Sequence, residues 1–198
     1  MTQVKRTQDS DPAAHARRLV EESGPIYGTL GERYLRESRG ITGPLPRELR
    51  FNPAVWTKET RSTHPALIVP AFEDGDVRRL QAILLNPETA AKASLTSAKL
   101  TFGRDAAHVP GDFAARSEGG PVLLAEGPED AITVWSVTGH RTLVAFSASS
   151  LDSIDLPDGT DLVICSDADE TGRKASLKAA KVHKQAGCRV RIARPVLP

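Results

Sequence analysis

The chain has 198 residues, of which 39% are hydrophobic and 26% charged, as is usual for one globular domain or a small domain with an extension. Its net charge of +1 provides no overall field that would draw it to nucleic acid, and its apolar runs are too short to span a membrane. The polar N-terminus lacks the apolar segment of a signal peptide, which favours a cytoplasmic protein. Neither of the two cysteines belongs to a CxxC pair, which excludes a zinc ribbon or disulfide framework.

Short helices are predicted near the N-terminus. We expect residues 1–10 to be disordered and a helix to occupy 11–22, where an aspartate at the N-cap position is followed by proline. Thr29 and Glu32 have the spacing of a capping box, which predicts the start of a second short helix. The segment 44–53 is punctuated by prolines and is expected to be rich in loops.

Two strands follow the loop-rich stretch. Residues 64–72 and 77–85 have the composition of strands, and residues 73–76 between them have the composition of a turn. The segment 86–116 is polar and basic, and residues 118–120 form a glycine-containing linker. We therefore assign residues 11–116 to a small N-terminal α+β lobe.

The pattern changes at Pro121, where strands and helices begin to alternate. The apolar runs VLLAEG and TLVAFSA and the segments 161–169 and 189–193 read as strands, with helical segments between them. Nearly continuous apolar strands that alternate with helices are typical of a parallel sheet covered on both faces. The predicted fold class is therefore α/β, with a mainly parallel sheet over residues 121–198, preceded by the α+β lobe.

Acidic residues end two of the predicted parallel strands. Glu126 follows the first strand, and Asp167 and Asp169 close the third. The carboxyl ends of parallel strands lie at one edge of a sheet, where ligands bind, so these three carboxylates are expected to converge. A set of oxygen ligands without histidine or thiolate favours Mg²⁺ or Mn²⁺. Taken singly, each acid has an alternative role as a helix cap or a solvated side chain.

The two acidic motifs resemble those of the Toprim domain. The matching segments are LLAEGPEDAITVW and VICSDADETGRKAS. Upstream, GTLGERYLRESRGI, LPRELRFNP, HPALIVPAFEDGDVRRLQAILLNP and KASLTSAKLTFG resemble the region that precedes Toprim in primase-like proteins of phages and plasmids. The resemblance therefore extends over nearly the whole chain.

The resemblance implies metal-dependent nucleotidyl transfer by a DNA primase-like core that makes short primers on single-stranded DNA for a phage or plasmid. The residues it assigns to catalysis and to Mg²⁺ or Mn²⁺ are Glu126, Asp167 and Asp169. The basic residues that it places at nucleotide or template are Lys92, Lys99 and Arg104. Arg173 is a further candidate for phosphate contact, because it comes one residue after Gly172 at the carboxylate edge.

The carboxylates leave two other functions open. A Toprim nuclease would use the same acids to activate water, and a non-catalytic accessory domain would only bind DNA. The chain has no cysteines for the zinc-binding module of primases, so it is expected to be a minimal core, a fragment, or a Toprim protein with another use. The implied partners are a single-stranded DNA template, nucleoside triphosphates and, as a further candidate, a replicative helicase or another replication protein; no membrane is expected.

Overall fold

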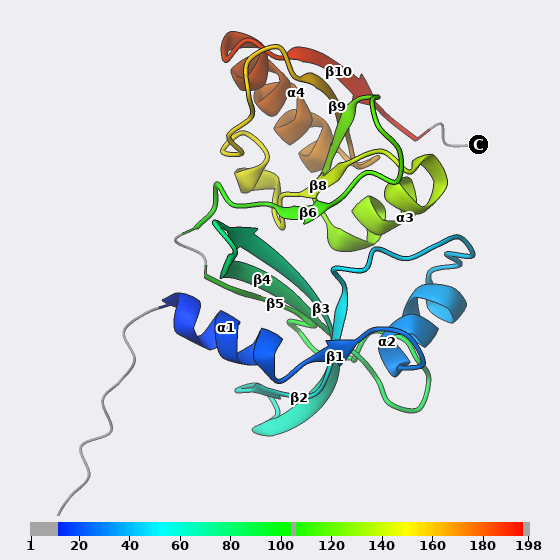
Figure 1. The fold of residues 1–198 in the computed structure, drawn as a ribbon. Helices are drawn as coiled ribbons and strands as arrows, with labels where there is room; N and C mark the ends of the chain where they lie inside the picture. Colours follow the sequence, from blue (N-terminus) through cyan, green and yellow to red (C-terminus); the bar gives the residue numbers. More distant parts are fainter. Residues whose placement is uncertain (1–11, 104–105, 196–198) are drawn as a thin grey trace, which may run out of the picture.

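Within residues 12–103 and 106–195, which the computed structural model describes, the strands form two five-stranded sheets (Figure 1). The first sheet is antiparallel throughout and has the order β1-β2-β3-β4-β5. Its strands are β1 (Gly24–Pro25), β2 (Arg50–Thr57), β3 (Ser62–Glu73), β4 (Asp76–Leu84) and β5 (Lys99–Phe102).

The long hairpin of β3 and β4 confirms the two strands predicted in this region. Asp74 and Gly75 connect them, and both have positive φ angles, of 52° and 84°. Two left-handed residues in sequence give a turn whose twist matches that of the flanking strands. Strand β2, by contrast, occupies part of the segment expected to be rich in loops. Pro53 is tolerated there because it lies at a break in the pairing with β3, between Asn52 and Val55.

The N-terminal half contains two helical segments among its described residues. Helix α1 (Pro12–Glu21) matches the predicted first helix, and α2 (Leu30–Arg33) continues into a π-helical turn over Tyr34–Ser38. Thr29 caps α2 by accepting from the N–H of Gly31 at 3.2 Å, as its position in the sequence predicts. None of the helices in the described ranges has the length and apolar character needed to cross a membrane.

The second sheet confirms the predicted α/β fold class. Its order is β10-β9-β7-β8-β6, in which the first four strands are parallel and β6 is antiparallel to β8. Its elements are β6 (Gly111–Phe113), β7 (Val122–Ala125), α3 (Pro128–Thr138), β8 (Thr142–Val144), a 3₁₀ turn (Ala148–Ser150), β9 (Asp161–Cys165), α4 (Glu170–Gln185) and β10 (Arg189–Ala193). Strand β6 lies within the segment that the sequence assigns to the N-terminal lobe, yet it forms an edge of the C-terminal sheet.

Helices α3 and α4 cover opposite faces of this parallel sheet. Leu124 of β7 packs in a cluster with Ala179 of α4, whereas the next residue, Ala125, packs in a cluster with Ile132 of α3. Consecutive residues of a strand point to opposite faces, so a short, almost wholly apolar strand supplies both layers of the core.

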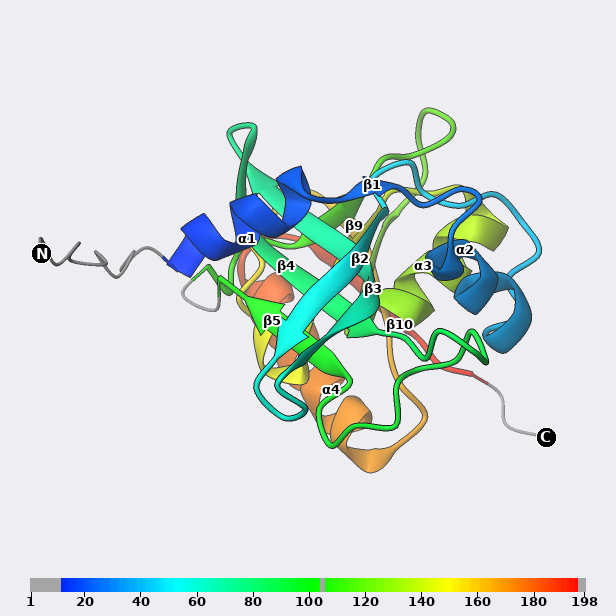
Figure 2. The ribbon, with the colours of Figure 1, turned by 90° about the horizontal axis from the view of Figure 1, so that it is seen from below.

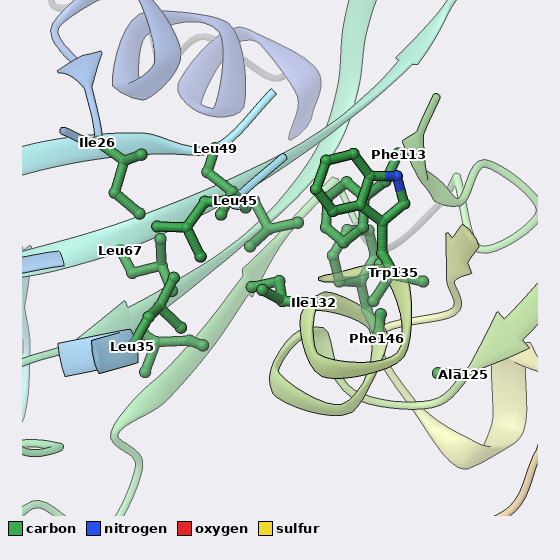
Figure 3. Close-up of a cluster of buried hydrophobic side chains, with 14 of the residues drawn as sticks. Ile26, Leu35, Leu45, Leu49, Leu67, Phe113, Ala125, Ile132, Trp135 and Phe146 are labelled. Atoms are coloured by element: carbon green, nitrogen blue, oxygen red, sulfur yellow. The ribbon is translucent and has the colours of Figure 1, made fainter. Parts of the chain in front are cut away.

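One hydrophobic cluster joins the two halves of the chain (Figure 3). Leu67 and Leu35 come from the N-terminal half, and Phe113, Ile132 and Trp135 come from the elements of the second sheet. The opposite face of the first sheet is covered by α1, which lies across its strands (Figure 2). The two sheets therefore share a core, and their relative position is determined by buried apolar contacts.

This shared core predicts one cooperative unfolding transition. Ile132 is fully buried in it, so Ile132→Ala should lower the free energy of unfolding by about 2–5 kcal/mol. Val137 lies on the same helix but is 79% exposed, and Val137→Ala should change stability by no more than roughly 0.5 kcal/mol. Urea unfolding followed by circular dichroism and by tryptophan fluorescence measures both. Two separate transitions, of which Ile132→Ala shifts one only, would contradict a shared core.

Candidate functional site

The carboxyl ends of β7 and β9 lie side by side, and acidic side chains follow each of them directly. Ala125, the last residue of β7, pairs in register with Cys165, the last residue of β9. Glu126 and Asp167 therefore leave the sheet at the same edge, and Asp169 follows at the start of α4. The structure thus brings the three predicted acids to one edge of the parallel sheet.

The acids at this edge interact with one another through space. Partial burial and the charges of Asp167 and Asp169 raise the pKa of Glu126, against the opposing effects of the backbone N–H of Ala148 and of Lys99. Burial and the charge of Asp130, followed by that of Asp169, raise the pKa of Asp167, again opposed by Lys99. Mutual repulsion between partly desolvated carboxylates is relieved by a cation, so the electrostatics of this edge favour cation binding.

Asp169 also has a structural role at the edge. Its Oδ1 accepts from the backbone N–H of Gly172 at 2.7 Å and so caps α4. Gly172 itself is closely packed, because a Cβ atom there would lie 2.6 Å from the Cβ of Asp167. A glycine at this position lets the first turn of α4 pass directly beside the Asp167 backbone.

Asp130 is a fourth acid at this edge, and the sequence analysis missed it. It lies in the first turn of α3, four residues after Glu126, and its charge raises the pKa of both Asp167 and Cys165. Its Oδ2 is 3.4 Å from the position that a Cβ of Gly127 would take. The signal in the sequence was the EGPED motif, in which the acid that ends a strand is followed by acids in the first turn of a helix.

Glu129, next to Asp130, is buried between the two halves of the chain with only 2% of its surface exposed. Its carboxylate lies 2.6 Å from the Nζ of Lys92 and 2.9 Å from the Nζ of Lys99, and it accepts from the hydroxyl of Tyr34 at 3.1 Å. The three partners all come from the N-terminal lobe. We call these four residues the Glu129 cluster. Sequence reasoning missed Glu129 as well, because a glutamate in the first turn of a helix is normally solvated.

The Glu129 carboxylate remains charged in spite of its burial. Burial by itself raises its pKa, but the charges and hydrogen bonds of Lys99 and Lys92 outweigh this effect and lower the pKa to about 2. Burial, followed by the Glu129 charge, raises the pKa of Tyr34, so the phenol stays protonated and donates. An ionised carboxylate is therefore paired with two ammonium groups at the junction of the two lobes.

The four predicted basic residues have different surroundings. Lys92 and Lys99 are brought together by Glu129, although 37% and 38% of their side chains stay exposed. Arg173 lies in the first turn of α4, with its Nη2 4.0 Å from Glu170 Oε1, and is about half exposed. Arg104 lies outside the described residues. Of the described basic residues, Lys99 is the one whose charge acts on both Glu126 and Asp167.

The donor set at the edge fits a hard divalent cation, although the side chains are not gathered into a closed site. Across residues 12–103 and 106–195, no three histidine, cysteine or acidic side chains are close enough, as they stand, to hold a metal ion. The acids that line the edge all offer oxygen atoms, and burial together with neighbouring carboxylates raises the pKa of Glu126 and of Asp167. Such a set suits Mg²⁺ or Mn²⁺, which take oxygen ligands.

Comparison with known families identifies both halves of the chain. Residues 121–198 match the family described as the Toprim domain, so the acidic edge belongs to a Toprim domain. Residues 10–110 match the family described as a domain of unknown function (DUF7146), and because this match spans more than half of the chain, the protein belongs to the DUF7146 family. A search of curated proteins found no match.

Solved structures with a similar fold are primase cores. The chain is 15% identical to the DnaG catalytic core, with a TM-score of 0.54 over 90% of this chain and 68% of that one. It is 19% identical to the primase fragment of the bacteriophage T7 primase-helicase protein (TM-score 0.46, 76% of this chain and 58% of that one). It is 17% identical to a DNA primase domain from Pseudomonas aeruginosa (TM-score 0.46, 72% and 48%).

The chain thus spans about half the length of the last two structures. At 15% identity the likeness to the DnaG core describes the fold. With the Toprim match, it confirms the resemblance to a Toprim protein of the primase type that the sequence motifs predicted.

The Glu129 cluster predicts a pH-dependent contribution to stability. Glu129→Gln should lower the free energy of unfolding near neutral pH by about 1–3 kcal/mol, because the two lysines lose their charged partner and an amide NH₂ group replaces one of the two carboxylate oxygens. The folded pKa of about 2 is below the ordinary value of 4.5, so this difference should be complete above pH 4.5 and should shrink as the pH falls toward 2.

Urea unfolding of both proteins across this pH range measures the difference. The control is Glu170→Gln, which removes a carboxylate from an exposed ion pair with Lys174 and should have little effect at any pH. A Glu129→Gln effect that does not change with pH would show that Glu129 is not charged in the folded protein.

Proposed function

We propose that this chain is a metal-dependent nucleotidyltransferase core of the primase type, which makes short primers on single-stranded DNA. The observation that carries the proposal is the acidic edge of the Toprim sheet, where Glu126, Asp167 and Asp169 lie beside the charge of Lys99. Phosphoryl transfer requires metal-held phosphates, cations and positioning, and little covalent chemistry from the protein. The acidic edge and its neighbouring lysine offer these elements.

In this proposal Asp167 and Asp169 hold Mg²⁺ or Mn²⁺, with Asp130 as a further acid within electrostatic range of Asp167. The bound ion supplies charge neutralisation at the phosphates and lowers the barrier to attack by a hydroxyl. Asp169 keeps one oxygen on the N–H of Gly172, which orients its carboxylate at the start of α4.

Glu126 is proposed as a further metal ligand or as the general base that removes the proton from an attacking 3′-hydroxyl. Its pKa is raised by burial and by Asp167, which makes its carboxylate a better proton acceptor near neutral pH. The backbone N–H of Ala148, in the loop after β8, partly opposes this rise in the pKa of Glu126.

Basic side chains are proposed to bind the nucleotide and the template. Lys92 and Lys99 each have three ammonium donors, so they can contact phosphate while remaining paired with Glu129. Arg173 is placed in the same first turn of α4 that Asp169 caps, and we propose that it contacts a phosphate as well. Arg104 has the same proposed role by its resemblance to primase cores.

The wider setting follows from the sequence resemblance. We propose that the protein primes replication of a phage or plasmid, that nucleoside triphosphates and single-stranded DNA are its substrates, and that a replicative helicase or another replication protein is its partner. Strand cleavage is the competing chemistry, because the same acids can activate water. The assay therefore has to detect shortened DNA as well as extended products.

The direct test is incubation with labelled ribonucleotides, single-stranded DNA and Mg²⁺ or Mn²⁺. The wild-type protein should give short labelled products, and Glu126→Gln should lower the rate by at least about 10²-fold, because the amide keeps the shape and loses the basicity. Glu118→Gln, at an exposed site, is the matched control. Shortened DNA without labelled products would favour the nuclease, and DNA binding without either product would favour the accessory domain.

Metal affinity provides a test that is independent of turnover. Asp167→Asn should weaken Mn²⁺ binding in isothermal titration calorimetry, because a charged oxygen ligand is lost. The same change should slightly stabilise the metal-free protein, because it removes repulsion from Asp130 and Asp169. Unchanged Mn²⁺ affinity together with a lower melting temperature would mean that Asp167 is a structural residue and not a ligand.

A further inference from the structure

Two buried polar side chains of β4 reach from the N-terminal sheet into the Toprim domain. Arg79 is 3% exposed and Gln81 is 4% exposed. The Nη1 atom of Arg79 donates to the backbone carbonyl oxygens of Ala107 and Ala145, both at 3.1 Å, and its Nη2 donates to the hydroxyl of Ser150 at 3.3 Å. A buried guanidinium thus binds both ends of the segment 145–150.

Gln81 and the ring of Phe146 complete these contacts. The Nε2 atom of Gln81 donates to the carbonyl oxygen of Phe146 at 3.2 Å and to the hydroxyl of Thr101 at 3.1 Å. The guanidinium of Arg79 stands 5.1 Å from the centre of the Phe146 ring. Both β4 side chains therefore contact residues 145–150, which we call the β8 loop.

The β8 loop has a conformation that needs such support. Phe146 has a φ angle of +66°, in the left-handed region that bulky residues rarely occupy. A conformation of this kind costs about 1–3 kcal/mol and persists where the surroundings hold it in place. The hydrogen bond from Gln81 to the Phe146 carbonyl and the stacking of Arg79 on the Phe146 ring hold this residue in its left-handed conformation.

The β8 loop leads directly to Glu126. The N–H of Ala145 donates to the carbonyl oxygen of Ala125 at 2.9 Å, so the loop starts beside the end of β7. Two residues after Phe146, the backbone N–H of Ala148 opposes the rise in the pKa of Glu126, so the loop also acts on this carboxylate electrostatically. A chain of hydrogen bonds therefore runs from Arg79 through Ala145 to Ala125, the residue that precedes Glu126 at the centre of the proposed site.

We propose that Arg79 and Gln81 are positioning residues for Glu126, which they orient through the β8 loop. This gives the DUF7146 lobe a defined part in the site, because it supplies the side chains that shape a loop of the Toprim domain. The inference rests on the proposed function of Glu126 as a metal ligand or base. Mutation of a residue that orients a metal ligand typically lowers metal affinity by about 10- to 100-fold.

The alternative is that these side chains only join the two lobes. A buried arginine that hydrogen-bonds to Ala107, Ala145 and Ser150 stabilises the junction whether or not Glu126 is oriented. Substitution distinguishes the two roles. Replacing a residue that only joins the lobes changes the melting temperature, whereas replacing a positioning residue also changes the amide exchange rate of Ala148 and the metal affinity of protein that is still folded.

The experiment compares Gln81→Leu and Arg79→Lys with two matched controls. Gln81→Leu removes the donor to Phe146 at nearly constant volume, and Thr101→Val removes only the other hydrogen bond of Gln81. Arg79→Lys keeps the charge and loses the guanidinium fork, and Arg78→Lys makes the same change at the neighbouring residue, which pairs with Glu73. Three quantities are measured: the melting temperature, the amide hydrogen exchange of Ala148 by NMR, and Mn²⁺ affinity by calorimetry.

We expect faster Ala148 exchange and about tenfold weaker Mn²⁺ binding in folded Gln81→Leu and Arg79→Lys, with wild-type values in both controls. Wild-type exchange or wild-type Mn²⁺ affinity in folded Gln81→Leu overturns the proposal. If Arg79→Lys does not fold, Gln81→Leu decides alone. If the wild-type protein binds no Mn²⁺, the proposed metal function fails. The exchange rate of Ala148 still decides whether β4 positions the loop, because it should be faster in Gln81→Leu than in Thr101→Val.

Discussion

The carboxylate of Glu129 loses its hydration when the two halves of the chain pack together, so its charge requires partners from the opposite side of the junction. Lys92, Lys99 and Tyr34 provide them, and all three come from the N-terminal lobe. An ion pair of this kind is stable only when the geometry is accurate, because removal of either side leaves buried charge uncompensated. The position of the lobe relative to α3 therefore depends on this cluster together with the surrounding apolar core.

The cluster also determines the electrostatics of the acidic edge. Because Lys99 is held by Glu129, its ammonium group stays within range of Glu126 and Asp167 and partly offsets the rise in the pKa of both. The acids nevertheless repel one another, and the fold compensates for this repulsion elsewhere. The hydrophobic cluster shared by the two sheets and the contacts from β4 to the β8 loop hold the edge in place.

The arrangement explains why the two lobes form one unit. The parallel sheet alone carries the acids, but the lysine that moderates their repulsion and the side chains that hold the β8 loop belong to the antiparallel sheet. In this protein the DUF7146 lobe is therefore part of the surroundings of the Toprim acids and not an independent neighbour. It meets α3 both through the apolar side chains around Ile132 and Trp135 and through the lysines that bind Glu129.

Local pattern was sufficient for the parallel sheet, the β3–β4 hairpin and the placement of Glu126 and Asp167 at one edge. Each of these depends on periodicity, on turn residues or on the common direction of parallel strands, which short stretches of sequence carry. The same reasoning missed the start of β2 because prolines there suggested loop. It predicted no strand at β6, and assigned those residues to the N-terminal lobe, because a three-residue strand carries almost no periodic signal.

By itself the sequence determined the fold class of the C-terminal half and the residue types at its acidic edge. Only the tertiary structure decided that Glu129 is buried, that Lys92 and Lys99 bind it, and that Arg79 and Gln81 reach the loop beside Glu126. The physical reason is that these contacts join residues far apart in the chain. Their partners and their burial are set by how the two sheets pack. A short stretch of sequence does not show which distant residue of opposite charge will pair with a charged side chain.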